Sequence, residues 1–177
     1  RVLFRSQLRD ALTIVAQKLA IGIDKLAQFA HRYRALPTLG FTHLQAAQPT
    51  TVGKRAALWA HDLSLALEEI EYRLSSLRFR GAKGTTGTQA SFLELFTAAC
   101  DGNVSQAHRR CDELDRLVTQ KMGWNPDRRF VITGQTYPRV LDGMVAGSLA
   151  SVAAALTKCA TDIRLRSEEH TSELQSP

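Results

Sequence analysis

A histidine between two long helical patterns is the best candidate for acid–base chemistry in this chain. His43 lies in the polar segment Leu36–Arg55 (LPTLGFTHLQAAQPTTVGKR), which contains proline and glycine and has no helical stripe over 38–48. An imidazole can donate or accept a proton near neutral pH. The neighbouring Thr42 and Gln45 could orient this ring or bind a substrate. From the local sequence alone, a loop histidine with a structural hydrogen bond remains the alternative.

A second polar segment, 78–88 (RFRGAKGTTGT), combines glycines, threonines and cations. Glycine allows close approach of the backbone, so exposed N–H groups could face an anion. Gln89 follows this segment, and its amide could bind a carboxylate or a base edge, or only its own backbone. Arg78, Arg80 and Lys83 could meet anionic groups or form a solvated surface. The segment lacks the GxxxxGK[ST] pattern, so nucleoside triphosphate binding is not implied.

The sequence does not support a metal site, a disulfide framework or a catalytic nucleophile. The three cysteines form no CxxC pair and are odd in number: Cys100, Cys111 and Cys159. This pattern favours neither a disulfide framework nor a zinc site, and a reducing cytosol is the default environment. Three further histidines lie beside charged residues in helical patterns and are interpreted as surface residues: His31, His61 and His108. No pair has HExxH spacing, and no GxSxG elbow occurs.

Long helical stripes must position the two polar segments. Apolar residues recur at steps of three and four over 7–34, 52–77 and 145–163, which predicts three long helices that each bury one face. Shorter helices are expected over 89–99 and 104–122, the latter polar, with a thin stripe of Ala107, Cys111, Leu114, Leu117 and Val118. Thr50 or Thr51 is the expected N-cap of the second long helix. The last helix, 137–165, is rich in small residues, which predicts that other helices surround it within the domain or at a subunit interface. No strand ladder and no repeat is found, so the fold class is all-α, a helix bundle.

Composition and charge limit the partners. The chain has 177 residues, of which 44% are hydrophobic, and a formal net charge of +6. A sizeable core can therefore form, and scattered cations are interpreted as a solvated surface that also suits an anionic substrate. The most apolar run, 143–157, carries no charge but is shorter than the roughly 20 residues that cross a membrane, so it is predicted to be a core helix.

Both ends of the chain resemble translated adapter DNA from short-read sequencing: RVLFRS at 1–6 and RSEEHTSELQSP at 166–177. We therefore predict three regions, a non-native end over 1–6, a central helical domain over 7–165, and a non-native, disordered tail over 166–177. The chain is then expected to be an internal piece of a longer protein.

Three stretches together resemble the adenylosuccinate lyases, in their eukaryotic form, of the fumarase/aspartase superfamily. They are LPTLGFTHLQAAQPTTVGKR (36–55), FRGAKGTTGTQASFLELF (79–96) and ITGQTYPRVLD (132–142). The resemblance covers essentially all of 7–165. It implies an all-α fold of long helices, a cytoplasmic homotetramer with active sites shared between subunits, no metal or organic cofactor, and neither nucleic-acid nor membrane partners.

The resemblance also implies a reaction and its residues. The family eliminates fumarate from adenylosuccinate, giving AMP, and from the succinylated aminoimidazole carboxamide ribotide of purine biosynthesis. A base removes a proton next to a carboxylate, and an acid protonates the leaving nitrogen. The histidine of the TH-x-Q motif, assigned as the acid, corresponds to His43. The substrate-binding residues correspond to Thr42, Gln45, Lys83, Thr88 and Gln89.

The chain departs from the family pattern in two ways. Ala46 stands where the family usually has proline, which removes no functional group. The family's general base is a serine on a mobile loop downstream of Leu165, and further binding segments precede Gln7, so we expect the chain alone to be inactive. Other interpretations are a sister lyase such as argininosuccinate lyase, a non-catalytic structural protein on this fold, as among lens crystallins, and nucleic-acid binding by the basic surface.

Overall fold

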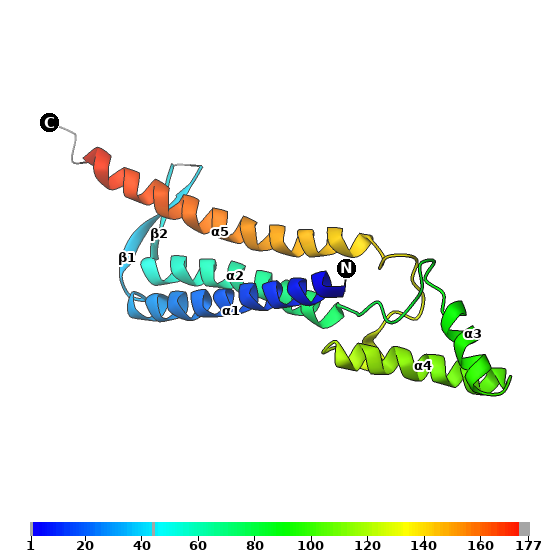
Figure 1. Ribbon diagram of the computed structural model, residues 1–177. Helices are drawn as coiled ribbons and strands as arrows, with labels where there is room; N and C mark the ends of the chain where they lie inside the picture. The colour runs from blue at the N-terminus through cyan, green and yellow to red at the C-terminus, as the bar shows by residue number, and fades with distance from the viewer. Residues whose placement is uncertain (1, 44, 174–177) are drawn as a thin grey trace. The chain divides into compact units, whose positions relative to one another are not determined.

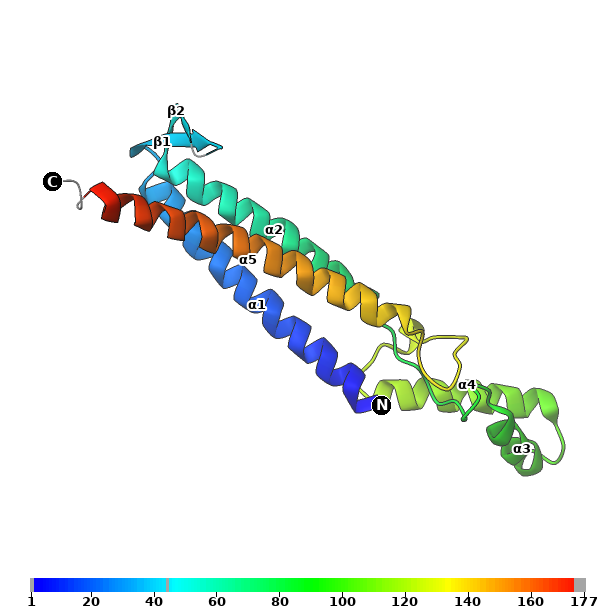
Figure 2. The same ribbon diagram turned by 90° about the horizontal axis from the view of Figure 1, so that it is seen from above.

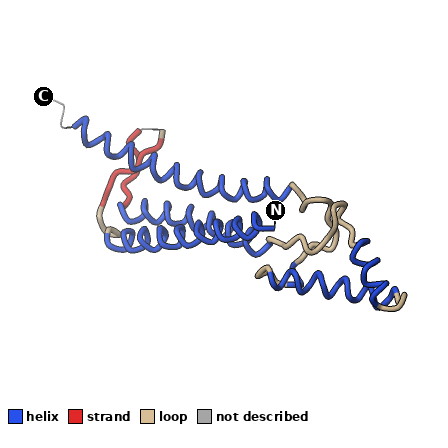
Figure 3. The backbone as a smooth tube through the Cα atoms, in the orientation of Figure 1, coloured by secondary structure: helices blue, strands red, loops and turns tan. Residues whose placement is uncertain are grey.

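The chain is built from long α-helices and one small β-hairpin (Figures 1 and 3). The computed structural model describes residues 2–43 and 45–173. In chain order, the elements are α1 (Val2–Arg32), β1 (Pro37–Thr42), β2 (Gln45–Thr51), α2 (Val52–Ser76), α3 (Ala90–Ala99), α4 (Val104–Lys121), the 3₁₀ helix η1 (Pro126–Arg128) and α5 (Val140–Glu173). The predicted all-α fold class is confirmed, and each predicted helix overlaps an observed one, although α1 begins earlier and α5 ends later than predicted.

These elements belong to two compact units. The first unit contains the start of α1 up to Arg9 together with Ser76–Gly143. The second contains Asp10–Ser75 and the chain from Met144 onward. This division does not test the predicted boundaries at 6/7 and 165/166, which stay predictions.

In the second unit, α1, α2 and α5 lie side by side in both views, with α2 antiparallel to the other two (Figures 1 and 2). The predicted stripes form its core. Buried members are Leu12, Leu19, Ala56, Leu63, Ile70, Val145 and Val152. Gly53 packs directly against the backbone of Ala30 and Arg34, so α2 can begin close to the end of α1. Thr51 accepts a hydrogen bond from the Lys54 amide at 3.1 Å, which confirms it as the cap of α2.

Helix α5 is covered on one side only within the described chain. Leu149, Leu156 and Ile163 are 39%, 49% and 52% exposed, although they belong to the predicted apolar stripe. The chain itself therefore does not surround this helix as predicted, and a subunit interface remains the alternative. By length and composition Val140–Leu165 could also cross a membrane, with a mean hydropathy of 1.6. A core helix of a soluble protein meets the same criteria, so the absence of a membrane partner stays a prediction.

The segment expected to be a loop forms an antiparallel hairpin, which corrects the prediction that no strand ladder exists. Pro37 pairs with Thr51 and Thr42 pairs with Gln45, with a bulge between Leu39 and Phe41. Threonine and phenylalanine favour extended backbone, and without a helical stripe the segment has no face that a helix could bury. The hairpin lies where α1 ends and α2 begins (Figure 2).

The first unit contains α3, α4, η1 and the long loops between them. Its core is centred on Phe79 and Trp124, whose ring centroids lie 6.0 Å apart. Of the stripe predicted for α4, Ala107 and Cys111 are buried, but Leu117 is 48% exposed. The polar residues Asp115 and Thr119 are buried in its place. Leu114 and Val118 of the predicted stripe are half-buried, so over the second half of α4 the buried face is shared with polar residues.

The predicted non-native ends stay a prediction, and the structure describes part of each as helix. Helix α5 continues to Glu173, because 166–173 contain no proline or glycine to end it. Residues 174–177 lie outside the described part of the chain. Residues 2–6 likewise continue α1 as helix.

Candidate active site

The predicted acid–base histidine stands at the tip of the hairpin. His43 has φ of +52°, a left-handed conformation that suits the tight turn of a two-residue hairpin. Thr42 and Gln45 pair across this turn, and all three side chains are exposed. Within the described residues, no hydrogen bond orients the His43 ring. The hairpin therefore presents an imidazole, a hydroxyl and an amide to whatever lies beyond its tip.

The hairpin is attached firmly to the bundle. The amides of Val52 and Gly53 donate to the carbonyls of Leu36 and Tyr33 at 2.9 and 3.0 Å. The Arg55 guanidinium, in the first turn of α2, donates to the Leu39 carbonyl at 3.1 Å. These bonds join the start of α2 to the end of α1 and to β1, so rigid elements set the position of the hairpin.

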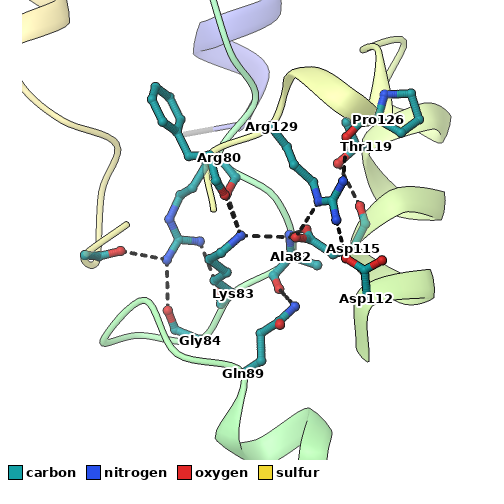
Figure 4. A network of polar contacts seen from close by, with 12 residues as sticks. Arg80, Ala82, Lys83, Gly84, Gln89, Asp112, Asp115, Thr119, Pro126 and Arg129 are labelled. Atoms are coloured by element: carbon teal, nitrogen blue, oxygen red, sulfur yellow. Dashed lines mark hydrogen bonds and ion pairs between the residues drawn. The ribbon is translucent and has the colours of Figure 1, made fainter. Parts of the chain in front are cut away.

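The Gly/Thr loop, defined here as 81–88, belongs to the first unit. Gly81 and Gly87 have φ of +85° and +84°, which only glycine adopts without strain. The Gly84 amide donates to the Thr88 carbonyl at 2.7 Å, closing the loop on itself. Gln89 donates through Nε2 to the Ala82 carbonyl at 3.1 Å, across the base of the loop (Figure 4). The loop thus fixes the Gln89 amide group while the Thr88 side chain stays exposed.

A buried charge network supports this loop from α4 (Figure 4). The Lys83 ammonium donates to Asp115 Oδ2 at 3.1 Å and to the carbonyls of Arg80 and Phe130 at 3.2 and 2.9 Å. Its side chain is only 5% exposed. All three ammonium donors are therefore engaged by protein oxygens, and a substrate anion could reach Lys83 only by displacing one of them.

Arg80 joins the Gly/Thr loop to the loop 132–136 that carries the ITGQT motif. Its guanidinium donates to the carbonyls of Lys83, Gly84 and Gly134 at 3.0, 2.9 and 3.1 Å. Gly87 also packs directly against the Thr133 carbonyl, leaving no room for a side chain. Two of the three motif segments therefore meet in one place.

The sequence of the chain is similar to the sequences of known lyases. The family model described as Lyase matches residues 1–176. The chain belongs to the lyase family. It is 43% identical over 171 residues to an adenylosuccinate lyase of Schistosoma mansoni, covering 96% of this chain and 33% of that protein. It is 48% identical over 158 residues to an adenylosuccinate lyase of Schizosaccharomyces pombe, covering 89% of this chain and 31% of that protein.

A solved structure shows the same fold. The crystal structure of a fumarate lyase from Mesorhizobium sp. BNC1 matches with a TM-score of 0.69 at 24% identity, covering 93% of this chain and 34% of that one. The resemblance to the adenylosuccinate lyases and the helix-bundle fold class predicted from the sequence are thereby confirmed. The chain spans about a third of the length of the curated relatives it matches.

The predicted site residues of this lyase chain form two groups. Thr42, His43 and Gln45 meet at the hairpin tip of the second unit. The other three, Lys83, Thr88 and Gln89, meet in the Gly/Thr loop of the first unit. The arrangement within each group is compatible with substrate contacts from His43, Thr42, Gln45, Thr88 and Gln89, whereas Lys83 is occupied by the protein.

Sequence reasoning missed the residues that support the loop. Asp115 and Arg129 bind one another, and Arg129 also binds Asp112, but none of them was a candidate. A signal did exist: Asp115 is four residues beyond Cys111 and eight beyond Ala107, on the same helical face. A carboxylate on a buried stripe requires a cation, and this lyase chain supplies two.

Among the described residues, the other titratable groups form no second candidate for a metal or nucleophile site. The described residues contain no cluster of three or more metal-ligating side chains. Burial raises the pKa of the Cys111 thiol. Burial and the nearby Asp162 charge raise the pKa of Cys159. Both thiols are thus kept protonated and are poor nucleophiles.

Proposed function

We propose that the complete protein to which this chain belongs is an adenylosuccinate lyase, a carbon–nitrogen lyase that eliminates fumarate from adenylosuccinate to give AMP. The same site would cleave the succinylated aminoimidazole carboxamide ribotide of purine biosynthesis. The single observation that carries this proposal is the 43–48% identity to adenylosuccinate lyases over nearly the whole chain.

The residues available fit this elimination. A base removes a proton from the succinyl carbon next to a carboxylate, the carbon–nitrogen bond breaks, and its electron pair stays on nitrogen. His43, exposed at the tip of an anchored hairpin, would protonate that nitrogen. Gln89 and Thr88, with Thr42 and Gln45, would bind the substrate. The base of this reaction is not among these residues.

The proposal includes an assembly and a location. The exposed apolar residues of α5 favour an interface in which this helix packs against other copies, forming a homotetramer with shared sites. No cofactor, nucleic acid or membrane is required for the reaction, and a cytoplasmic location suits a metabolic enzyme with free thiols.

The test is fumarate release from adenylosuccinate by the full-length protein and its His43→Asn variant. Asparagine tolerates a positive φ but cannot transfer a proton as imidazole does, so kcat should fall by about 10²–10⁴-fold with little change in thermal stability. His108→Asn, an exposed histidine on α4, is the matched control and should keep full activity.

Three results would speak against the proposal. Absence of fumarate release by the wild-type protein would favour the non-catalytic structural interpretation. Faster cleavage of argininosuccinate would favour the sister lyase. Binding of duplex DNA or RNA that weakens steeply with salt would favour the nucleic-acid interpretation.

A further inference from the structure

Asp115 is a buried carboxylate on α4, and each of its two oxygens accepts a hydrogen bond from the Gly/Thr loop. It is only 4% exposed. Oδ1 accepts a 2.6 Å hydrogen bond from the Ala82 amide. Oδ2 accepts bonds of 3.1 Å from both Lys83 Nζ and Arg129 Nε. Two cations therefore compensate the buried negative charge, and one oxygen is left to hold a backbone group.

This arrangement fixes the loop in register. A carboxylate that accepts a hydrogen bond from a backbone N–H holds the main chain at one particular residue. A bond to a flexible side chain would leave the main chain free to move. Gly81, just before Ala82, packs so closely against the Asp115 carboxylate that no Cβ fits between them. Lys83, just after Ala82, binds the same carboxylate. Three consecutive loop residues are thus held by one side chain.

Ala82 also connects Asp115 to Gln89, whose side-chain amide is predicted to bind the substrate. Ala82 donates its N–H to Asp115 and accepts a 3.1 Å hydrogen bond from Gln89 Nε2 on its carbonyl (Figure 4). A single residue therefore links the buried carboxylate to the Gln89 amide. A shift of Ala82 would turn the Gln89 carboxamide away from its present orientation.

We propose that Asp115 is a positioning residue, which holds the Gly/Thr loop and thereby orients Gln89 toward the substrate. This inference rests on the proposed function for its kinetic consequence, but its structural consequence can be measured independently. Asp115 does not itself touch the substrate, since both of its oxygens are engaged by protein donors.

The experiment compares Asp115→Asn with two control variants in the full-length protein. Asp112→Asn removes the other carboxylate that binds Arg129 but has no bond to the loop. Thr119→Val changes a fully buried residue of the same helix, whose hydroxyl bonds only to the Asp115 carbonyl. We expect Asp115→Asn to raise KM for adenylosuccinate about tenfold or more and to speed amide exchange at residues 82–89. Neither control should do so, even where Thr119→Val lowers Tm by an equal amount.

If Asp115→Asn does not fold, Asp115→Glu is the variant to measure. It keeps the charge but moves the oxygens by one methylene, so KM and loop exchange should rise while Tm changes less. The proposal is overturned if Thr119→Val at a matched loss of Tm raises KM equally, or if both Asp115 variants keep wild-type KM and loop exchange. If the wild-type protein does not cleave adenylosuccinate, the proposed function fails, and amide exchange at Ala82 still decides the role of Asp115.

Discussion

The indole Nε1 of Trp59 donates a 2.8 Å hydrogen bond to Asp162 Oδ2, and this bond joins α2 to α5. Lys158 donates to the same carboxylate oxygen at 2.9 Å. Burial raises the pKa of Asp162, but the hydrogen bonds from Lys158 and Trp59, with the charges of Lys158 and Arg55, outweigh it and lower the pKa below its usual value. Asp162 is therefore ionised at neutral pH and acts as an acceptor for both donors.

Trp59→Phe should lower the free energy of unfolding by about 1–2 kcal/mol, as expected for a hydrogen bond to a partly solvated charged group. Trp59 lines an apolar pocket together with Leu26, Phe29 and Ile163, and phenylalanine keeps an aromatic ring at that position. Urea denaturation of the full-length protein measures the loss. Lys158→Met is the control, because its exposed pair with Asp162 should contribute less than 1 kcal/mol. Equal losses in the two variants would contradict a specific role of the indole.

Glu69 should make the stability of the second unit sensitive to acid. Hydrogen bonds from Ser148 and Arg73 lower its pKa below the ordinary value of 4.5. The folded protein therefore favours the ionised form, so the stabilisation is complete at neutral pH and is lost as pH falls below about 4.5 through the lowered folded-state pKa. Ser148→Ala removes the largest cause and should shift the acid-unfolding midpoint upward, measured by circular dichroism between about pH 2 and 7. Ser151→Ala, whose hydroxyl bonds only to its own helix, should leave the midpoint unchanged.

The helices could be predicted from the sequence, and so could the buried faces of α1 and α2, because each of these two stripes expresses a local rule. In α1, Leu12 and Leu19 lie on the predicted stripe and are buried, whereas Ile14 and Ile21 lie off it and are exposed. A period of three to four residues determines which face of a helix is apolar, and no tertiary information is needed.

The hairpin and the charge network could not be predicted in this way. The pairing of Thr42 with Gln45 depends on a turn in which His43 adopts a positive φ, which is rare outside glycine. The hydrogen bond that the Ala82 amide donates to Asp115 joins residues 33 positions apart, so no periodic pattern in the sequence could indicate it. The candidate residues at the hairpin came from a motif resemblance, whereas those that hold the Gly/Thr loop required the structure.

Arg80→Lys should destabilise the first unit even though the charge is kept. The guanidinium reaches the carbonyls of Lys83, Gly84 and Gly134, whereas an ammonium is a single point donor that cannot span them. We expect a loss of about 1–3 kcal/mol, with faster amide exchange at 84–88. The carbonyls of Lys83 and Gly134 would lose the guanidinium donor, whereas the Gly84 carbonyl would keep its bond from the Gly87 amide. Arg78→Lys is the matched control, because Arg78 is exposed two residues earlier. Similar behaviour of both variants would show that only the charge at this end of the loop matters.

Gly87→Ala should be more damaging than Gly102→Ala, although both glycines have a positive φ, of +84° and +82° respectively. A side chain at either position should lose about 1–2 kcal/mol from the left-handed backbone alone. Around Gly102 nothing lies within 4 Å of the added Cβ, so no further loss is expected. At Gly87 the Cβ would overlap the carbonyl of Thr133 and come within 2.8 Å of the Gly134 carbonyl oxygen, which adds about 1–3 kcal/mol of overpacking. Urea denaturation of the two variants isolates this steric contribution. Equal losses would mean that the Gly/Thr loop and the loop 132–136 are not in direct contact in solution.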